Sequence, residues 1–91
     1  MADDPDIAIA IKYDKEKDNA PRVIAKGMRV KAEKLKQIAK ENNIPLMRNV
    51  ALANSLYRVE VGEEVPEELY DAVAEVLNFV YALKEEQSKR K

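Results

Sequence analysis

The chain has 91 residues, of which 46% are hydrophobic and 36% charged, and its formal net charge is −1. This length suits one small domain, and the apolar share argues against disorder. The near-zero net charge excludes a global attraction to nucleic acid or to an anionic membrane. We expect a single domain over residues 1–91, with flexible ends at residues 1–6 and 85–91.

Two residue types that carry much of protein chemistry are missing, because the sequence contains no histidine and no cysteine. Their absence removes the usual general base, the commonest metal ligand and all thiol chemistry. No apolar run approaches the roughly 18 residues of a membrane span. The acidic start, residues 1–6, lacks the basic character of a signal peptide. We expect a soluble protein of cytoplasmic type, and the excess of lysine and glutamate favours a thermophilic source.

The first third of the chain predicts two strands. Residues 7–11 alternate isoleucine and alanine, so both faces are apolar, which is typical of a strand covered on both sides. A solvated turn over residues 15–19 leads to a second, antiparallel strand over residues 22–26. Pro21 stands at its beginning, where a residue without an N–H is tolerated, and Gly27 closes it.

The middle third predicts a helix and a third strand. Residues 28–42 have the helical period, and Asn42 and Asn43 form a good stop signal because asparagine tolerates left-handed backbone. The predicted buried face consists of Met28, Ala32, Leu35, Ile38 and Ala39. Residues 44–47 are apolar and too short for a helix, so they predict a third strand reached by a right-handed crossover.

The last third predicts two helices. Asn49 is placed to cap a short helix over residues 50–58, and acidic residues after Pro66 favour the start of a final helix. The buried stripe of that helix is predicted to hold Leu69, Val73, Val76, Leu77 and Val80, extended by Tyr70, Ala74 and Leu83. The predicted fold class is α/β, a small mixed sheet with helices packed on both faces.

The search for catalytic groups gives no candidate. Nucleophilic catalysis needs an activated side chain beside a base, but the serines, Ser55 and Ser88, have no histidine to activate them. Adjacent glutamates occur at residues 63–64, 67–68 and 85–86, where we expect solvated positions that leave their acidity ordinary. The two glycines, Gly27 and Gly62, exclude a glycine-rich phosphate loop. We therefore expect no enzyme activity and no cofactor.

Two charged clusters lack the pattern of a binding site. Asp3, Asp4 and Asp6 do not have the spacing of a calcium loop, so we expect no metal site. A basic group on the predicted first helix has interleaved acids and no aromatic companions, so we expect no nucleic-acid binding. That group comprises Arg29, Lys31, Lys34, Lys36 and Lys40. The residues themselves thus indicate a small α/β module that binds other proteins.

Three stretches, taken in series, resemble the FlhB/YscU export-switch family. The first runs over residues 7–14 and 19–27, from the alternating isoleucines to the Ala-Pro-Arg-Val segment. The second covers residues 38–45 and 50–57, and the third covers residues 62–81. Each stretch alone could equally reflect packing in an ordinary hydrophobic core. Their shared order and spacing over about residues 7–84 make the resemblance specific.

The resemblance implies a non-enzymatic, protein-binding role in flagellar type III export. In the family, such a domain hangs on the cytoplasmic side of the inner-membrane export gate. It docks export substrates, responds to a hook-length control protein and switches export from rod and hook proteins to filament proteins. The implied partners are the export-gate membrane proteins, the rod and hook substrates and the hook-length control protein.

The sequence departs from the family at the self-cleavage motif, Asn-Pro-Thr-His. At the matching positions stand Asp3, Asp4, Pro5 and Asp6, so we expect no self-cleavage. The family strand that precedes the motif is also missing, which predicts an unpaired sheet edge beside residues 7–12, open to strand addition. Two origins stay open, a stand-alone FlhB-like paralogue and an excised or engineered piece of a longer protein.

The resemblance also implies a substrate-docking depression. Carried over residue by residue, it joins Ala20 and Pro21 at the start of the second strand with Ala74 and Leu77 on the last helix. Ala20 and Pro21 lie at a junction of loop and strand, where we expect exposure. Plain packing is the alternative for Ala74 and Leu77, because both belong to the apolar side of their helix.

Overall fold

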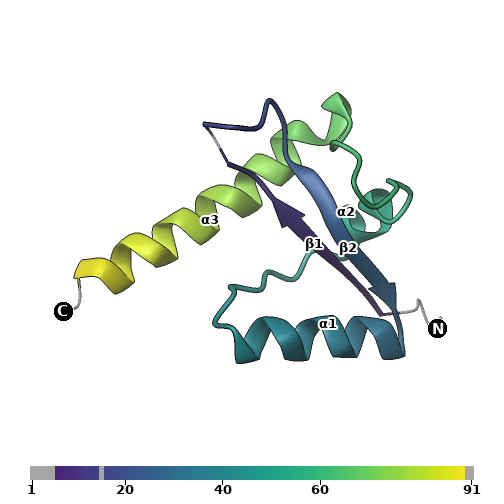
Figure 1. Ribbon diagram of the computed structural model, residues 1–91, viewed down its shortest axis with the longest axis horizontal. Coiled ribbons are helices and arrows are strands. Elements are labelled where there is room, and N and C mark those ends of the chain that lie inside the picture. Colours follow the sequence, from purple (N-terminus) through teal and green to yellow (C-terminus); the bar gives the residue numbers. More distant parts are fainter. Residues whose placement is uncertain (1–5, 15, 90–91) are drawn as a thin grey trace.

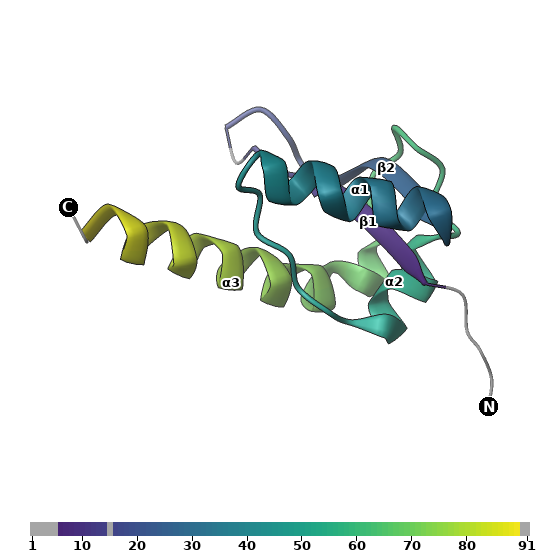
Figure 2. The same cartoon turned by 90° about the horizontal axis from the view of Figure 1, so that it is seen from below.

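The computed structural model describes residues 6–14 and 16–89, and its elements form two helical layers around a β-hairpin (Figure 1). The elements in chain order are β1 (Ile7–Lys12), β2 (Arg22–Met28), α1 (Val30–Glu41), α2 (Val50–Leu56), the 3-10 turn η1 (Glu67–Leu69) and α3 (Tyr70–Lys89). Helix α1 covers one face of the hairpin, and α2 and α3 cover the other (Figure 2). The predicted α/β class with helices on both faces is confirmed. The second half of α3 projects beyond the sheet (Figure 1).

The two predicted strands pair antiparallel, as expected, with one irregularity. Ala10 pairs with Ala25 and Ile11 pairs with Val23, so Ile24 is an extra residue in β2. Such a bulge sharpens the twist of the hairpin and leaves the side chain of Ile24 half exposed.

β2 is longer than predicted, because Gly27 lies inside the strand rather than at its end. Gly27 pairs with Ala8, and a Cβ atom built on Gly27 would lie 2.7 Å from the Cβ of Lys31 in α1. The helix therefore approaches the sheet closely over small residues. The predicted helix start was wrong by two residues: Met28 is still paired in β2, and Arg29, with φ 59°, turns the chain directly into α1.

The third strand was wrongly predicted. Residues 44–49 connect α1 to α2 in irregular conformation, and Ile44, Leu46 and Met47 are about half exposed. A short apolar run has the same pattern whether it forms a buried strand or a surface connection, so the pattern does not distinguish the two. Because this strand is absent, the described sheet is a two-stranded antiparallel one, without the mixed pairing and crossover predicted.

The segment before η1 occupies the free edge of β2, where a third strand would pair. Val23 exchanges two backbone hydrogen bonds with this segment, donating to Glu63 at 3.1 Å and accepting from Gly62 at 2.7 Å. Val65 donates to the carbonyl oxygen of Pro21 at 2.8 Å. On the opposite side, no backbone bond within residues 6–14 and 16–89 reaches the outer edge of β1.

The core lies between the hairpin and the α2–α3 layer. Its buried members are Val23, Leu52, Leu56, Val59, Val65 and Val73. Ile9 and Ile11 reach it from β1, and Leu69, Val76 and Leu77 reach it from η1 and α3. These last three were predicted to be buried and pack as expected, whereas Tyr70 and Ala74, predicted to extend the stripe, are exposed. The side chains of Val80 and Leu83 lie outside the described set.

The helix ends confirm the predicted caps. Asn43 adopts left-handed backbone with φ 57°, and the next amide, of Ile44, donates to the carbonyl of Ala39 at 2.8 Å. Asn49 accepts a hydrogen bond from the Leu52 amide at 3.1 Å, which caps α2. At the other end of α2, the Lys26 ammonium donates to the carbonyl oxygens of Tyr57 and Val59, both at 2.9 Å. This lysine fixes α2 to the sheet.

Candidate functional site

The four predicted docking residues come from two parts of the fold and differ in exposure. Ala20 is 2% exposed, so the expectation that it lies on the surface was wrong. Pro21 is half-buried, and its carbonyl is held by the Val65 amide. The loop-to-strand junction is thus a packed corner, because the segment leading to η1 closes over the start of β2. A docked peptide could reach the Pro21 side chain more readily than that of Ala20.

The two α3 candidates are neighbours one turn apart on their helix but differ in exposure. Leu77 is half-buried and packs against the core, whereas Ala74 is exposed. An alanine on the surface of a helix leaves space for another chain to approach the backbone. Docking at these four positions stays a prediction, and Ala74 and the exposed part of Pro21 and Leu77 are the groups able to touch a partner.

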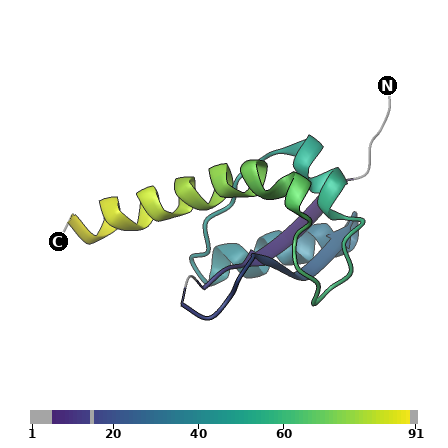
Figure 3. The same cartoon turned by 90° about the horizontal axis from the view of Figure 1, so that it is seen from above.

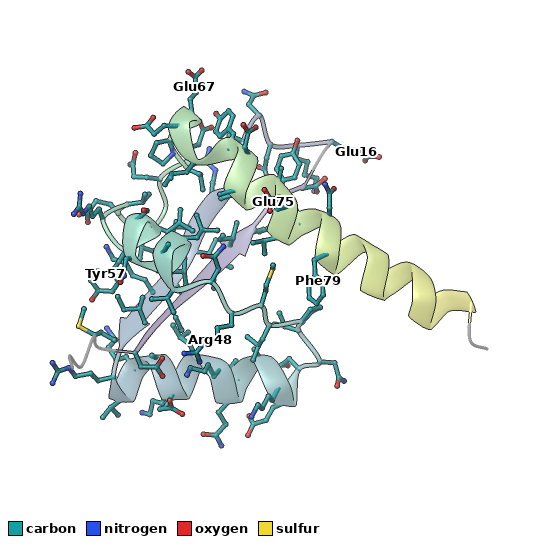
Figure 4. All side chains as sticks on the ribbon, turned by 180° about the vertical axis from the view of Figure 1, so that it is seen from behind. Glu16, Arg48, Tyr57, Glu67, Glu75 and Phe79 are labelled. Carbon is teal, nitrogen blue, oxygen red and sulfur yellow. The ribbon has the colours of Figure 1, made fainter. Side chains whose placement is uncertain are left out.

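Of the four residues expected at the self-cleavage positions, Asp6 lies in the described part of the chain, while Asp3, Asp4 and Pro5 lie outside it. Its carboxylate binds the ammonium of Lys36 in α1, which also bonds Glu33 at 3.2 Å. The hydrogen bond from Lys36 lowers the pKa of Asp6 below its usual 3.8, and Arg48 adds a weaker attraction. Figure 4 shows Arg48 over α1. Asp6 thus ties the entry of β1 to α1.

This ion pair predicts a pH-dependent effect of Asp6→Asn. Because the pKa of Asp6 is lowered in the folded state, its contribution to stability is present above pH 3.8 and is lost as pH falls through the folded value. The variant should be less stable than wild type near neutral pH, and the difference should vanish in acid. Chemical unfolding at several pH values measures this.

The Lys36→Met variant gives the control for this pair. Asp6→Asn should have little further effect in a Lys36→Met background, because the partner charge is already gone. Equal effects of Asp6→Asn in both backgrounds, or a difference that persists at low pH, would contradict the assigned pairing.

The described residues hold no catalytic constellation. Ser55 is exposed on α2, and the sequence has no histidine that could act as its base. No group of three carboxylates within the described residues is arranged to hold a metal ion. None of the helices described in residues 6–14 and 16–89 has the length and apolar character needed to cross a bilayer.

A groove that the sequence did not reveal runs between α2 and the segment leading into α3, which lie side by side (Figure 3). Two adjoining hollows form it, and both are lined by Ser55 and Leu69. One hollow is acidic, with Glu60, Glu63, Glu64 and Glu68 around Val59 and Pro66. The other hollow is uncharged and is lined also by Asn49, Ala51, Leu52 and Ala72. The sequence predicts only a solvated face for such glutamates, since nothing local to them indicates that α2 packs nearby.

A profile of the FlhB HrpN YscU SpaS family matches residues 4–80. The chain belongs to this family. The flagellar biosynthetic proteins FlhB of Escherichia coli strain K12 and Bacillus subtilis strain 168 are 45% and 46% identical to it over 78 and 79 residues. These matches cover 85% and 86% of this chain but 20% and 22% of the relatives, so the chain spans about a fifth of their length.

Solved structures of the family share the fold. The cytoplasmic domain of FlhB from Shewanella putrefaciens superposes with a TM-score of 0.86 at 39% identity, covering 92% of this chain and 66% of that one. The PscU C-terminal domain gives a TM-score of 0.77 at 34% identity, covering 80% and 94% of the two chains. The resemblance to FlhB/YscU export components is confirmed, and this chain has the architecture of their C-terminal domains.

Proposed function

We propose that this chain is a non-enzymatic docking domain of the flagellar type III export apparatus. In this role it binds rod and hook proteins and takes part in the switch to filament proteins. The observation that carries the proposal is the agreement with FlhB in both sequence and fold over most of the chain. The absence of histidine and cysteine supports binding rather than catalysis.

The proposed location is the cytoplasmic face of the inner membrane, next to the export gate. The partners would be the gate's membrane proteins, the rod and hook substrates and the hook-length control protein. The proposed docking surface joins Pro21 with Ala74 and Leu77, whereas Ala20 is buried. A surface made of so few accessible apolar side chains suits weak, reversible binding of export substrates.

The test replaces an exposed member of this surface rather than a buried one. Ala74→Gln should weaken binding of a purified hook protein by about 1–3 kcal/mol, because a polar side chain would be desolvated without a partner. Isothermal titration calorimetry measures the dissociation constant. The control is Asn54→Gln, at an exposed position of α2 rather than on β2 or α3, which should leave binding unchanged. Unaltered binding by Ala74→Gln, with wild-type folding, would refute the surface.

A second candidate function is favoured by the burial of Ala20, which takes that side chain out of reach of a substrate. In this alternative the FlhB-like chain replaces, or competes with, the C-terminal fragment of FlhB without recognising substrates. Pull-down assays separate the two. Capture of export-gate proteins without hook protein supports the alternative, and capture of both supports the docking domain.

A further inference from the structure

We propose that the groove between α2 and the η1–α3 segment binds an extended peptide that is basic at one end and apolar at the other. The inference goes beyond the docking function proposed above, because none of the four predicted docking residues lines the groove. It rests on the shape of two joined hollows and on the difference in charge between them.

The acidic hollow carries four exposed carboxylates, Glu60, Glu63, Glu64 and Glu68, and one basic side chain, Arg58. Among the described ion pairs, Glu64 alone of these four has a basic partner, Arg22, at 3.5 Å. The excess of negative charge therefore remains available to cations from another molecule. Lysine or arginine side chains complement it, whereas an acidic segment would be repelled.

The wall of this hollow is held in place before any partner arrives. Val23 of β2 makes its two backbone hydrogen bonds to Gly62 and Glu63, and the Arg22 guanidinium donates to the Gly62 carbonyl at 2.9 Å. Gly62 itself has φ 95°, a conformation that glycine adopts without a steric penalty. A fixed acidic wall loses little conformational entropy on binding, which favours specific recognition.

Apolar residues line both hollows. Val59 and Pro66 line the acidic hollow, Leu69 lines both, and Leu52 and Ala72 line the second. The rim of this second hollow has neutral, short side chains, Asn49, Ala51 and Ser55. A bound peptide would therefore place cationic residues beside the glutamates and apolar residues beside Ala72.

The test uses a short fluorescent peptide with lysines in its first half and leucines in its second half. Fluorescence anisotropy gives its dissociation constant with the full chain. Removing three groove carboxylates, by Glu60→Gln, Glu63→Gln and Glu68→Gln together, should weaken binding by about tenfold, as expected for three partly screened ion pairs. The matched control removes three carboxylates that do not line the groove, by Glu67→Gln, Asp71→Asn and Glu75→Gln. Figure 4 shows Glu67 pointing away from the body.

The dissociation constant of the control variant should lie within about twofold of the wild-type value. At physiological salt, screening limits the electrostatic effect of an exposed charge to groups close to it. Equal weakening in both triple variants would overturn the proposal in favour of a diffuse charge effect. Absence of binding to wild type would overturn it as well.

A second pair of variants tests the shape without changing charge. Ser55→Phe fills the point where the two hollows meet, whereas Asn54→Phe adds the same ring to an exposed position of α2 outside both. Ser55→Phe should weaken peptide binding at least about fivefold, as loss of one buried apolar contact would predict. Binding at wild-type strength by Ser55→Phe would overturn the groove as the site. This probe is no export protein, so failure here leaves the docking test unaffected.

Discussion

Replacing Leu56 with alanine is expected to lower the free energy of unfolding by about 2–5 kcal/mol, the range for truncating a buried leucine. Leu56 is 1% exposed and belongs to the cluster that joins β2, α2, the segment before η1 and α3. Truncation would leave a cavity where these four parts of the fold meet. For a domain of this size the melting temperature should fall by about 10 °C or more. Thermal and chemical unfolding measure the change.

The control for this prediction is Leu46→Ala, the same change of side chain at a position 48% exposed. It should alter stability by less than about 0.5–1 kcal/mol, because little apolar area leaves water at this position on folding. The comparison also tests the connection between α1 and α2. If Leu46 belonged to a buried third strand, its truncation would cost as much as that of Leu56.

The helices could be predicted from the sequence, whereas the conformation of the segment that contains Leu46 could not. Periodicity over long segments identified α1 and α3, because apolar residues spaced every three or four positions gather into one stripe when the backbone is helical. The run at residues 44–47 is too short to show a period, and its state depends on whether a sheet edge is free to receive it. Residues 62–65 occupy that edge of β2 through hydrogen bonds made by backbone atoms, which leave no mark on side-chain patterns.

The two candidate sites also differ in how far they could be predicted from the sequence. The docking residues Ala20, Pro21, Ala74 and Leu77 were named through resemblance to a family, and the residues alone would have been assigned to packing. The burial of Ala20 was not predictable, because it depends on the distant segment that closes over the start of β2. The acidic groove could be found only from the structure, since Ser55 of α2 and Glu68 of η1 become neighbours through tertiary packing.

Gly27 is expected to be the most size-sensitive position of the hairpin. A Cβ there would lie 2.7 Å from the Cβ of Lys31 and 2.9 Å from its backbone carbonyl carbon, closer than such atoms approach in proteins. Relief requires α1 to move away from the sheet, since a backbone atom cannot swing aside. Gly27→Ala should therefore cost about 1–3 kcal/mol of stability, and Gly27→Val more, as overpacking predicts. Denaturant midpoints measure both variants.

Gly62 differs from Gly27, because backbone conformation rather than lack of space favours glycine there. A Cβ at Gly62 meets no atom within 4 Å, but φ is 95°, where residues with side chains are strained. Size should matter little there, so Gly62→Asn should be no worse than Gly62→Ala, since asparagine tolerates positive φ. At Gly27 the loss of stability should instead increase with the size of the new side chain, so Gly27→Asn should be less stable than Gly27→Ala. A Gly27→Ala variant with the wild-type denaturant midpoint would show that α1 does not lie as close to β2 as the steric argument requires.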